Sequence, residues 1–193
     1  MTVAGLLLAA GSGSRLGTPK ALVSLRGELL VERGQRLLRD GGCVPVLVVL
    51  GAQAEQAARH APDHVVAEHW ATGMGASLRA GLAALQDRPE VDAVVVALAD
   101  QPNVGAGSID LLRQAYLAGA VAAVATYAGK ARNPVLLSRP VWAEVAVLAE
   151  GDTGARPWLR THPELVVEVS CDATGSPEDV DTPADLAALE APA

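Results

Sequence analysis

The sequence has few aromatic residues and few cysteines, and each shortage excludes a class of protein. Only 3% of the 193 residues are aromatic, with three Trp, two Tyr and no Phe, although half of the chain is hydrophobic. The core must therefore be built from Ala, Val and Leu, which suits close-packed helices on a β-sheet and excludes an intrinsically disordered chain. The two cysteines, Cys43 and Cys171, form no Cys-x-x-Cys pair. We therefore expect no disulfide framework and a reducing, cytoplasmic location.

Positive charge and long hydrophobic runs are also in short supply. The 15 Lys and Arg residues face 22 Asp and Glu residues, which leaves a net charge of −7. A protein that binds a phosphate backbone needs the opposite balance, so we do not expect nucleic acid as a partner. A nucleotide ligand would need a few well-placed cations and Mg²⁺. Apolar runs such as residues 93–99 are far shorter than the ~20 residues of a membrane span, so no membrane partner is expected.

Apolar runs alternate with helical spacing along the first 118 residues or so. The alternation predicts an α/β protein, a three-layer α/β/α sandwich with a mostly parallel sheet. A length of 193 residues predicts a single domain over residues 1–193. Ligands of such sheets bind beyond the carboxyl ends of the strands. We expect strands at 3–9, 44–50, 65–67, 93–99, 121–127, 135–137 and 165–169, and helices at 28–39, 52–60, 75–85, 108–117 (capped by Ser108), 139–148, 155–160 and 183–189 (capped by Asp181 or Thr182).

A glycine-rich loop follows the first expected strand. Backbone N–H groups approach phosphates closely in such loops because no Cβ intervenes. The dinucleotide fingerprint is broken, since Gly11 and Gly13 fit but Gly17 comes one residue late, and the Gly-Lys-Ser/Thr of a Walker loop is absent. Arg15 and Lys20 add two cations to the loop. The combination predicts a phosphate site, and the alternative is a flexible turn with two solvated cations.

A carboxylate ends the clearest apolar strand, at Asp100. A carboxylate at the carboxyl tip of a central strand is placed to hold Mg²⁺, which takes one or two protein carboxylates and keeps most of its waters. The alternative is a turn residue, because Asp shortly before Pro is common in turns.

Two further segments carry glycines or paired carboxylates. Gly73 and Gly75 let the backbone approach a ligand, and Ser77 follows in the first turn of a helix, where it could read a base or ribose; a plain glycine-rich helix start is the alternative. Asp179 and Asp181 precede a helix that begins with Pro. Capping alone explains one of them, whereas an alternating pair also fits a second metal ligand.

These pieces together resemble the MobA/MocA-like nucleotidyltransferases over nearly the whole chain. The family motif Leu-Ala-Ala/Gly-Gly-x-Ser/Gly-x-Arg-x-Gly-x-x-Lys is matched from Leu8 to Lys20, and the MocA branch, the molybdenum cofactor cytidylyltransferases, is nearest. The resemblance implies the Rossmann-like, nucleotide-diphospho-sugar transferase fold. Relatives that transfer guanylyl groups usually have Leu-Ala-Gly-Gly, so Ala10 favours CTP. The segments behind the MocA assignment are 8–11, 73–78, 99–102, 133–135, 151–156 and 179–183.

The resemblance also implies roles at the matching positions, with CTP or another NTP and a molybdopterin-type acceptor as substrates and a molybdoenzyme as transient partner. Asn133 stands where many relatives have His, and either Asp181 or Asp179 could be the second metal ligand. The implied residues are Leu8, Ala9, Ala10, Gly11, Ser12, Gly13, Arg15, Lys20, Gly73, Gly75, Ser77 and Asp100 for the nucleotide; Arg15, Lys20 and Asp100 for catalysis; Asp100 and Asp181 for Mg²⁺; and Gln101, Asn133 and Arg156 for the acceptor.

The expected reaction is an in-line attack of the acceptor's terminal phosphate on the α-phosphorus of CTP, with loss of pyrophosphate. The protein must align two polyanions and stabilise charge on the α-phosphoryl oxygens, without a side-chain nucleophile. Two alternatives remain open. One is a guanylyltransferase or another NTP transferase with a different phosphorylated acceptor. The other is a non-catalytic partner that hands a cofactor to a molybdoenzyme.

Overall fold

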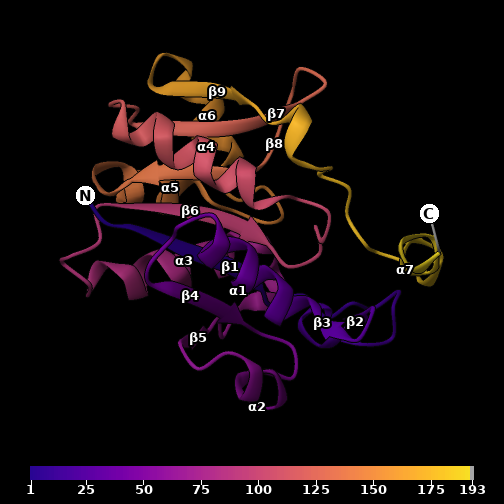
Figure 1. The fold of residues 1–193 in the computed structure, drawn as a ribbon. Coiled ribbons are helices and arrows are strands. Elements are labelled where there is room, and N and C mark those ends of the chain that lie inside the picture. Colours follow the sequence, from indigo (N-terminus) through magenta and orange to yellow (C-terminus); the bar gives the residue numbers. More distant parts are fainter. Residues whose placement is uncertain (192–193) are drawn as a thin grey trace.

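The computed structural model describes residues 1–191, and a single mixed sheet lies at their centre (Figure 1). Its seven strands follow the order β5-β4-β1-β6-β8-β7-β9. Neighbouring strands run parallel except at β8, which is antiparallel to both β6 and β7. The mostly parallel sheet confirms the expected α/β fold. The strands are β1 (Val3–Ala9), β4 (Val46–Leu50), β5 (His64–Val66), β6 (Ala93–Leu98), β7 (Ala122–Tyr127), β8 (Lys130–Ser138) and β9 (Val166–Ser170).

Helices cover both faces of the sheet, which explains why its inner strands are apolar without interruption. In β1, Leu6 and Leu8 pack in the core under α3 (Met74–Gln86), α5 (Trp142–Leu148) and α6 (Arg156–Thr161). Leu7 and Ala9 pack on the other face, under α1 (Leu30–Asp40) and α4 (Ala106–Leu117). Strands buried on both faces lose the polar alternation of a half-exposed strand. This is the three-layer sandwich that the sequence predicts.

Smaller elements lie at the edges of the sandwich. α7 (Pro183–Glu190) stands apart from the sheet at the end of an extended segment and contacts a small hairpin of β2 (Ser24–Leu25) and β3 (Glu28–Leu29) (Figure 1). Thr182 caps α7 by accepting a hydrogen bond from the Asp185 backbone N–H at 3.2 Å, as expected. The remaining elements are α2 (Ala54–Ala57) and short 3₁₀ turns at Lys20–Leu22, Ala58–His60, Trp70–Thr72, Arg139–Val141, Pro163–Leu165 and Asp172–Thr174.

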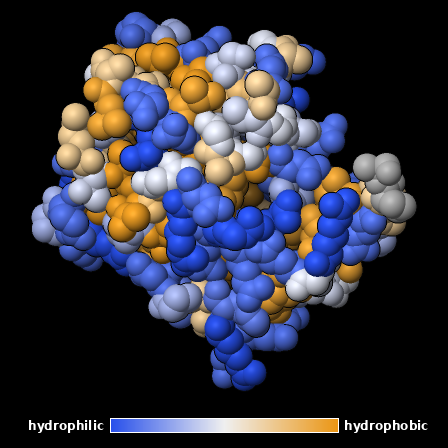
Figure 2. Space-filling model, in the orientation of Figure 1, coloured by the Kyte–Doolittle hydropathy of each residue, from blue (hydrophilic) through white to orange (hydrophobic). Residues whose placement is uncertain are grey.

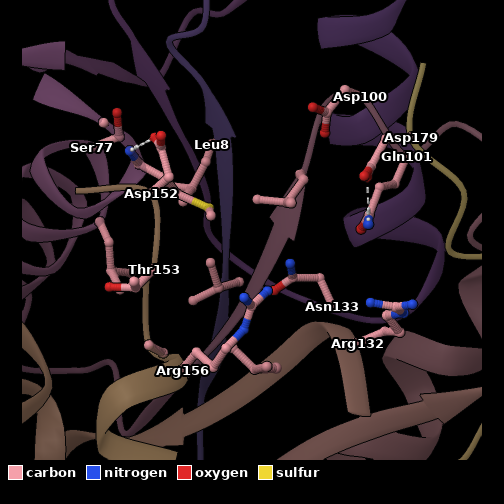
Figure 3. A pocket seen from close by; sticks show the side chains of 18 of the residues that line it. Leu8, Ser77, Asp100, Gln101, Arg132, Asn133, Asp152, Thr153, Arg156 and Asp179 are labelled. Atoms are coloured by element: carbon pink, nitrogen blue, oxygen red, sulfur yellow. Dashed lines mark hydrogen bonds between the residues drawn. The ribbon is translucent and has the colours of Figure 1, made fainter. Parts of the chain in front are cut away.

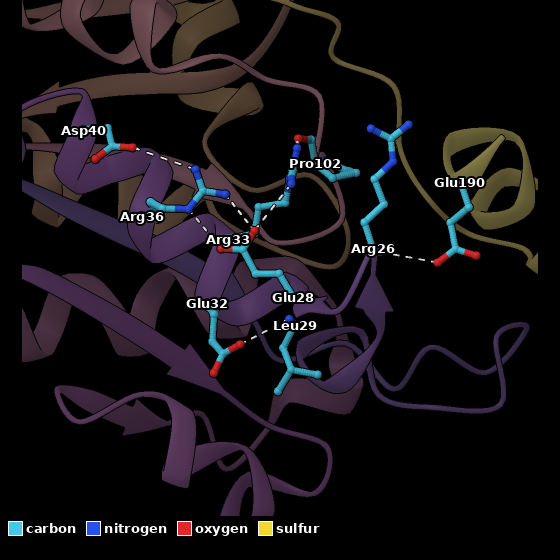
Figure 4. A network of polar contacts seen from close by, with 9 residues as sticks. All are labelled: Arg26, Glu28, Leu29, Glu32, Arg33, Arg36, Asp40, Pro102 and Glu190. Carbon is cyan, nitrogen blue, oxygen red and sulfur yellow. Dashed lines mark hydrogen bonds and ion pairs between the residues drawn. The ribbon is translucent and has the colours of Figure 1, made fainter. Parts of the chain in front are cut away.

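A polar network joins α1 to the turn after β6 (Figure 4). Arg33 Nε donates a hydrogen bond to the carbonyl of Pro102 at 2.9 Å. Glu28 accepts hydrogen bonds from Arg36 at 2.9 and 2.7 Å, and this partner holds the pKa of Glu28 below its ordinary value. At the right of Figure 4, the backbone N–H of Arg26 donates a hydrogen bond to the Glu190 side chain of α7. The network fixes the turn that carries Asp100.

Some expected boundaries are wrong, each for a local reason. Ser108 is not the cap of α4: the helix begins at Ala106 after Gly105, and the Ser108 hydroxyl donates back to the Gly105 carbonyl at 2.7 Å. β8 has nine residues rather than three, because it pairs with a strand on each side. The expected helices 52–60 and 139–148 each divide into an α-helix and a 3₁₀ turn.

The surface of the described chain is mixed in polarity. Hydrophobic residues reach the face shown in Figure 2 in small groups separated by hydrophilic ones. None of the helices within residues 1–191 has the length and hydrophobicity that a membrane span requires. Both cysteines are buried and unpaired, and burial raises the pKa of Cys43 to about 12.

Replacing Trp142 by alanine should lower the free energy of unfolding by about 3–5 kcal/mol. Trp142 is fully buried, and its indole N–H donates to the carbonyl of Leu137 at 3.0 Å, so alanine leaves a cavity and removes this hydrogen bond. Urea unfolding measures the loss. Val147→Ala, in the same helix but at a side chain that is 75% exposed, should change stability by less than about 0.5 kcal/mol. Similar losses in both variants would contradict this packing.

Candidate functional site

A cavity of about 920 Å³ lies at the carboxyl ends of β1 and β6. Leu8 pairs with Leu98 across these two strands, so the segments that follow them open onto the same edge of the sheet. Figure 3 shows the labelled side chains in three groups around this space. The predicted residues that line the cavity are Leu8, Ala9, Ala10, Gly11, Ser12, Lys20, Gly73, Ser77, Asp100, Gln101, Asn133 and Arg156.

Four predicted residues lie outside this lining: Gly13, Arg15, Gly75 and Asp181. Gly13 is buried with a φ of +57°, and a Cβ there would meet the carbonyl oxygen of Thr18 at 1.9 Å. It therefore lets the glycine-rich loop fold tightly on itself. Arg15 is exposed on the outside of the same loop. Asp181 does not line the cavity, but it contacts a residue that does.

A pair of polar contacts at the cavity edge joins Lys20 to two carboxylates. The Lys20 ammonium contacts Asp100 Oδ2 and lies 2.5 Å from Asp181 Oδ1. The Lys20 and Asp100 side chains are only 21% and 18% exposed. Burial by itself lowers the pKa of Lys20, but the charges and hydrogen bonds of the two carboxylates outweigh it, so the pKa is raised. Lys20 is therefore a firmly protonated cation at neutral pH.

The C-terminal segment is held against the turn that carries Asp100. The backbone N–H of Val180 donates to the carbonyl of Asp100 at 2.8 Å. The Gln101 amide donates to Asp179 Oδ1 at 2.9 Å. Burial, followed by the nearby charge of Asp100, raises the pKa of Asp179. This segment brings both candidate second ligands, Asp179 and Asp181, to the Asp100 side of the cavity.

The donor set at this edge suits a hard divalent cation. Within residues 1–191, no group of three or more His, Cys, Asp or Glu side chains is arranged to hold a metal ion. Two carboxylates, Asp100 and Asp181, nevertheless converge on one cation, the Lys20 ammonium. Mg²⁺ and Mn²⁺ bind through one or two protein carboxylates together with water and substrate phosphates. The two carboxylates therefore fit a metal that is completed by a nucleotide.

On the opposite side, the start of α3 is joined to the loop before α6. The Gly75 N–H donates to the carbonyl of Gly151 at 2.8 Å. The Met74 N–H donates to Asp152 Oδ1 at 3.3 Å, as drawn in Figure 3. Ser77 is buried just behind, in the first turns of α3. The two segments that the sequence assigns to nucleotide and acceptor therefore form one connected unit.

Replacing Gly73 by alanine should destabilise the protein and weaken nucleotide binding. Gly73 has a φ of +119°, and a Cβ would lie 2.4 Å from the carbonyl carbon of Gly151. Gly119→Ala is the matched control, since Gly119 has a φ of +104° with open space around it. We expect a loss of about 1–2 kcal/mol from φ alone at Gly119, and about 1–3 kcal/mol more at Gly73 from the clash. Equal losses of unfolding free energy in the two variants, measured by urea unfolding, would show that the loop at Gly151 moves aside without cost.

The third side of the cavity carries arginines that the sequence reading missed. Arg132 and Arg160 line the cavity together with Arg156. The spacing of four residues between Arg156 and Arg160 along one helix was the available signal for one of them. Arg132 adjoins Asn133, but only the long β8 brings both to the cavity. Trp70 packs on the core and also lines the cavity.

Comparison with known proteins places these features in context. A family model described as "MobA-like NTP transferase domain" matches residues 5–166. The chain is 37% identical to the "Nicotine blue oxidoreductase" of Paenarthrobacter nicotinovorans over 192 residues, which cover 93% of this chain and 92% of that protein. It is 35% identical to a "Probable molybdenum cofactor guanylyltransferase" of Opitutus terrae over 122 residues, or 63% of this chain and 59% of the relative.

Solved structures agree over almost the whole chain. The crystal structure of Rv0371c from Mycobacterium tuberculosis H37Rv has a TM-score of 0.83 at 32% identity, covering 98% of this chain and 97% of the other. The same protein in complex with manganese has a TM-score of 0.79 at 30% identity, with 98% of each chain covered. A relative with this fold thus binds a divalent cation.

Proposed function

Because the chain belongs to the MobA-like NTP transferase family, we propose that it is a nucleotidyltransferase of the molybdenum cofactor cytidylyltransferase type. It moves CMP from CTP to the terminal phosphate of a molybdopterin-type acceptor, within a single domain. An acceptor oxygen forms a new bond to the α-phosphorus, the bond from the α-phosphorus to the bridging oxygen breaks, and pyrophosphate leaves. The observation that carries the proposal is the meeting of the glycine-rich loop, Lys20 and the Asp100–Asp181 pair at one edge of the sheet.

The chain's own residues divide the work between the three sides of the cavity. The backbone at Leu8–Gly11 and the turn from Gly73 to Ser77 hold the base and ribose, with Ala10 favouring cytosine. Lys20 holds the triphosphate, and Arg15, exposed on the same loop, is the second cation assigned to it. The acceptor side is formed by Gln101, Asn133 and Arg156, to which we add Arg132 and Arg160. Four guanidinium or ammonium groups, those of Lys20, Arg132, Arg156 and Arg160, thus line a cavity for two polyanions that an acidic protein would otherwise repel.

The metal belongs to the same edge. Asp100 and Asp181 would hold Mg²⁺, which supplies positive charge to the phosphate oxygens when bound. Lys20 adds a positive charge near the phosphates, and the buried turn after β6 keeps Asp100 in place. The manganese-bound relative supports a divalent cation as the cofactor.

Titration calorimetry with CTP, GTP, ATP and UTP, with and without Mg²⁺, is the first test of this proposal. Selective, Mg²⁺-dependent CTP binding followed by acceptor-dependent pyrophosphate release is the expected result. A preference for GTP would move the protein to the guanylyl branch, in line with the Opitutus relative's name. Binding of no nucleotide under any condition would favour the non-catalytic partner of a molybdoenzyme.

A second candidate function comes from the relative named as an oxidoreductase, which matches 93% of this chain. On that reading, the large cavity would take a flat aromatic substrate beside Trp70 rather than a pterin. The late third glycine, Gly17, speaks against a nicotinamide dinucleotide in the loop. The assay is NADH or NADPH oxidation at 340 nm with nicotine blue. Turnover there, without nucleotide transfer, would establish the reductase and overturn the transferase.

A further inference from the structure

One ammonium group stands between the two carboxylates that the proposed function assigns to the metal. Lys20 Nζ contacts Asp100 and Asp181, which are 80 and 161 residues away in the sequence. No other Lys or Arg within residues 1–191 forms an ion pair with either carboxylate. Arg15, the other cation of the glycine-rich loop, is exposed to solvent and forms no ion pair with Asp100 or Asp181. Among the Lys and Arg side chains of residues 1–191, Lys20 alone therefore balances the negative charge of Asp100 and Asp181.

We propose that Lys20 is the internal counter-ion of the metal site, so that a divalent cation binds by displacing its ammonium group from Asp100 and Asp181. The inference rests on the proposed function, which places metal and triphosphate at this edge. It adds a new role to Lys20: the residue resists metal binding in the free protein and becomes available to the phosphates once the metal has replaced it.

The charges of the carboxylates and the position of the Lys20 ammonium explain why metal and nucleotide binding should be coupled. Two carboxylates this close, with Asp179 beside them, repel one another unless a cation lies between them. The ammonium and a metal ion cannot both occupy the position between the two carboxylates, and an ammonium released from both has all three of its N–H donors available for phosphate oxygens. A metal and a nucleotide that each favour the displaced state must favour each other. The free protein should therefore bind metal weakly, and metal with nucleotide tightly.

The first experiment measures Mn²⁺ binding in the absence of nucleotide, by electron paramagnetic resonance. Lys20→Gln should bind Mn²⁺ about tenfold more tightly than the wild-type protein, a coupling of ordinary size. Arg15→Gln removes the same charge from the same loop without touching the carboxylates, and should change the affinity less than about twofold. Equal affinity in the wild-type protein and Lys20→Gln would overturn the proposal, as would an equal gain in both variants.

A second measurement uses the wild-type chain and does not depend on how a variant folds. The sequence contains only two lysines, Lys20 and Lys130, so a ¹⁵N-lysine-labelled protein gives two side-chain signals. Lys130→Arg assigns them. Added Mg²⁺ should shift the Lys20 Nζ resonance and leave that of Lys130, which is exposed at the start of β8, unchanged. A Lys20 signal that stays in place while the metal binds would overturn the displacement.

Failure of the inference and failure of the proposed function give different results. If CTP and Mg²⁺ bind and CMP is transferred, but Lys20→Gln leaves Mn²⁺ affinity unchanged, only the counter-ion role is wrong. If neither the wild-type protein nor Lys20→Gln binds Mn²⁺, even with CTP present, the assignment of the metal site is wrong, and so is the inference that rests on it.

Discussion

Replacing Lys20 by alanine should lower kcat for CMP transfer by about 10²–10³-fold, the usual loss when one preorganised group that stabilises transition-state charge is removed. The chemistry asks little of the protein besides alignment and charge, so removing a cation at the triphosphate directly removes stabilisation of the transition state. Steady-state assays of pyrophosphate release at saturating CTP measure the loss. The fold should remain intact, because the Lys20 backbone N–H still donates to the Gly11 carbonyl at 3.1 Å.

Lys130→Ala is the matched control for this prediction. It removes the only other lysine, from an exposed position that does not line the cavity. Turnover should stay within about twofold of the wild-type value, as for surface substitutions away from a site. Turnover near the wild-type value in Lys20→Ala would remove the transferase assignment, provided that circular dichroism shows the variant folded.

Asp100→Asn should abolish the Mg²⁺ dependence of the reaction and lower turnover by about 10²-fold or more, since a bound metal contributes several kcal/mol to stabilising transition-state charge. The asparagine keeps the size of the side chain and leaves the backbone carbonyl that accepts from Val180. The carboxylate charge is lost, and with it the contact that draws Lys20 to the site. A Mg²⁺ titration of pyrophosphate release, with EDTA as the zero point, measures the change.

The same assay separates the two candidates for second ligand. Asp181 meets the Lys20 ammonium at 2.5 Å, whereas Asp179 accepts a hydrogen bond from Gln101, and its pKa is raised by burial and by Asp100. Asp181→Asn should therefore raise the Mg²⁺ requirement far more than Asp179→Asn. The reverse order would assign the metal to Asp179, and an unchanged Mg²⁺ dependence in Asp100→Asn would exclude this metal site altogether.

The sequence predicts most of the helices and strands, but it predicts their first and last residues less well. Strand β1 is found at its expected residues, and the central strand before Asp100 ends within one residue of expectation. Apolar runs decide such strands because both faces are buried. Ser108 was misread because a hydroxyl near a helix start can bond to the backbone in more than one way, and here it donates instead of capping. The length of β8 depends on two neighbouring strands and has no local signal.

The residues of the candidate site, like the elements of the fold, were predicted only in part from the sequence. The sequence by itself determined the α/β class, the glycine-rich loop after β1 and the carboxylate at the end of β6, because each is a local pattern of residues that follow one another. Only the tertiary structure decided that Lys20 meets Asp181, 161 residues away, and that Gly75 is tied to Gly151. It also left Arg15 exposed and brought Arg132 to the cavity. Such contacts depend on how distant segments cross the edge of the sheet, and no spacing along the chain records that crossing.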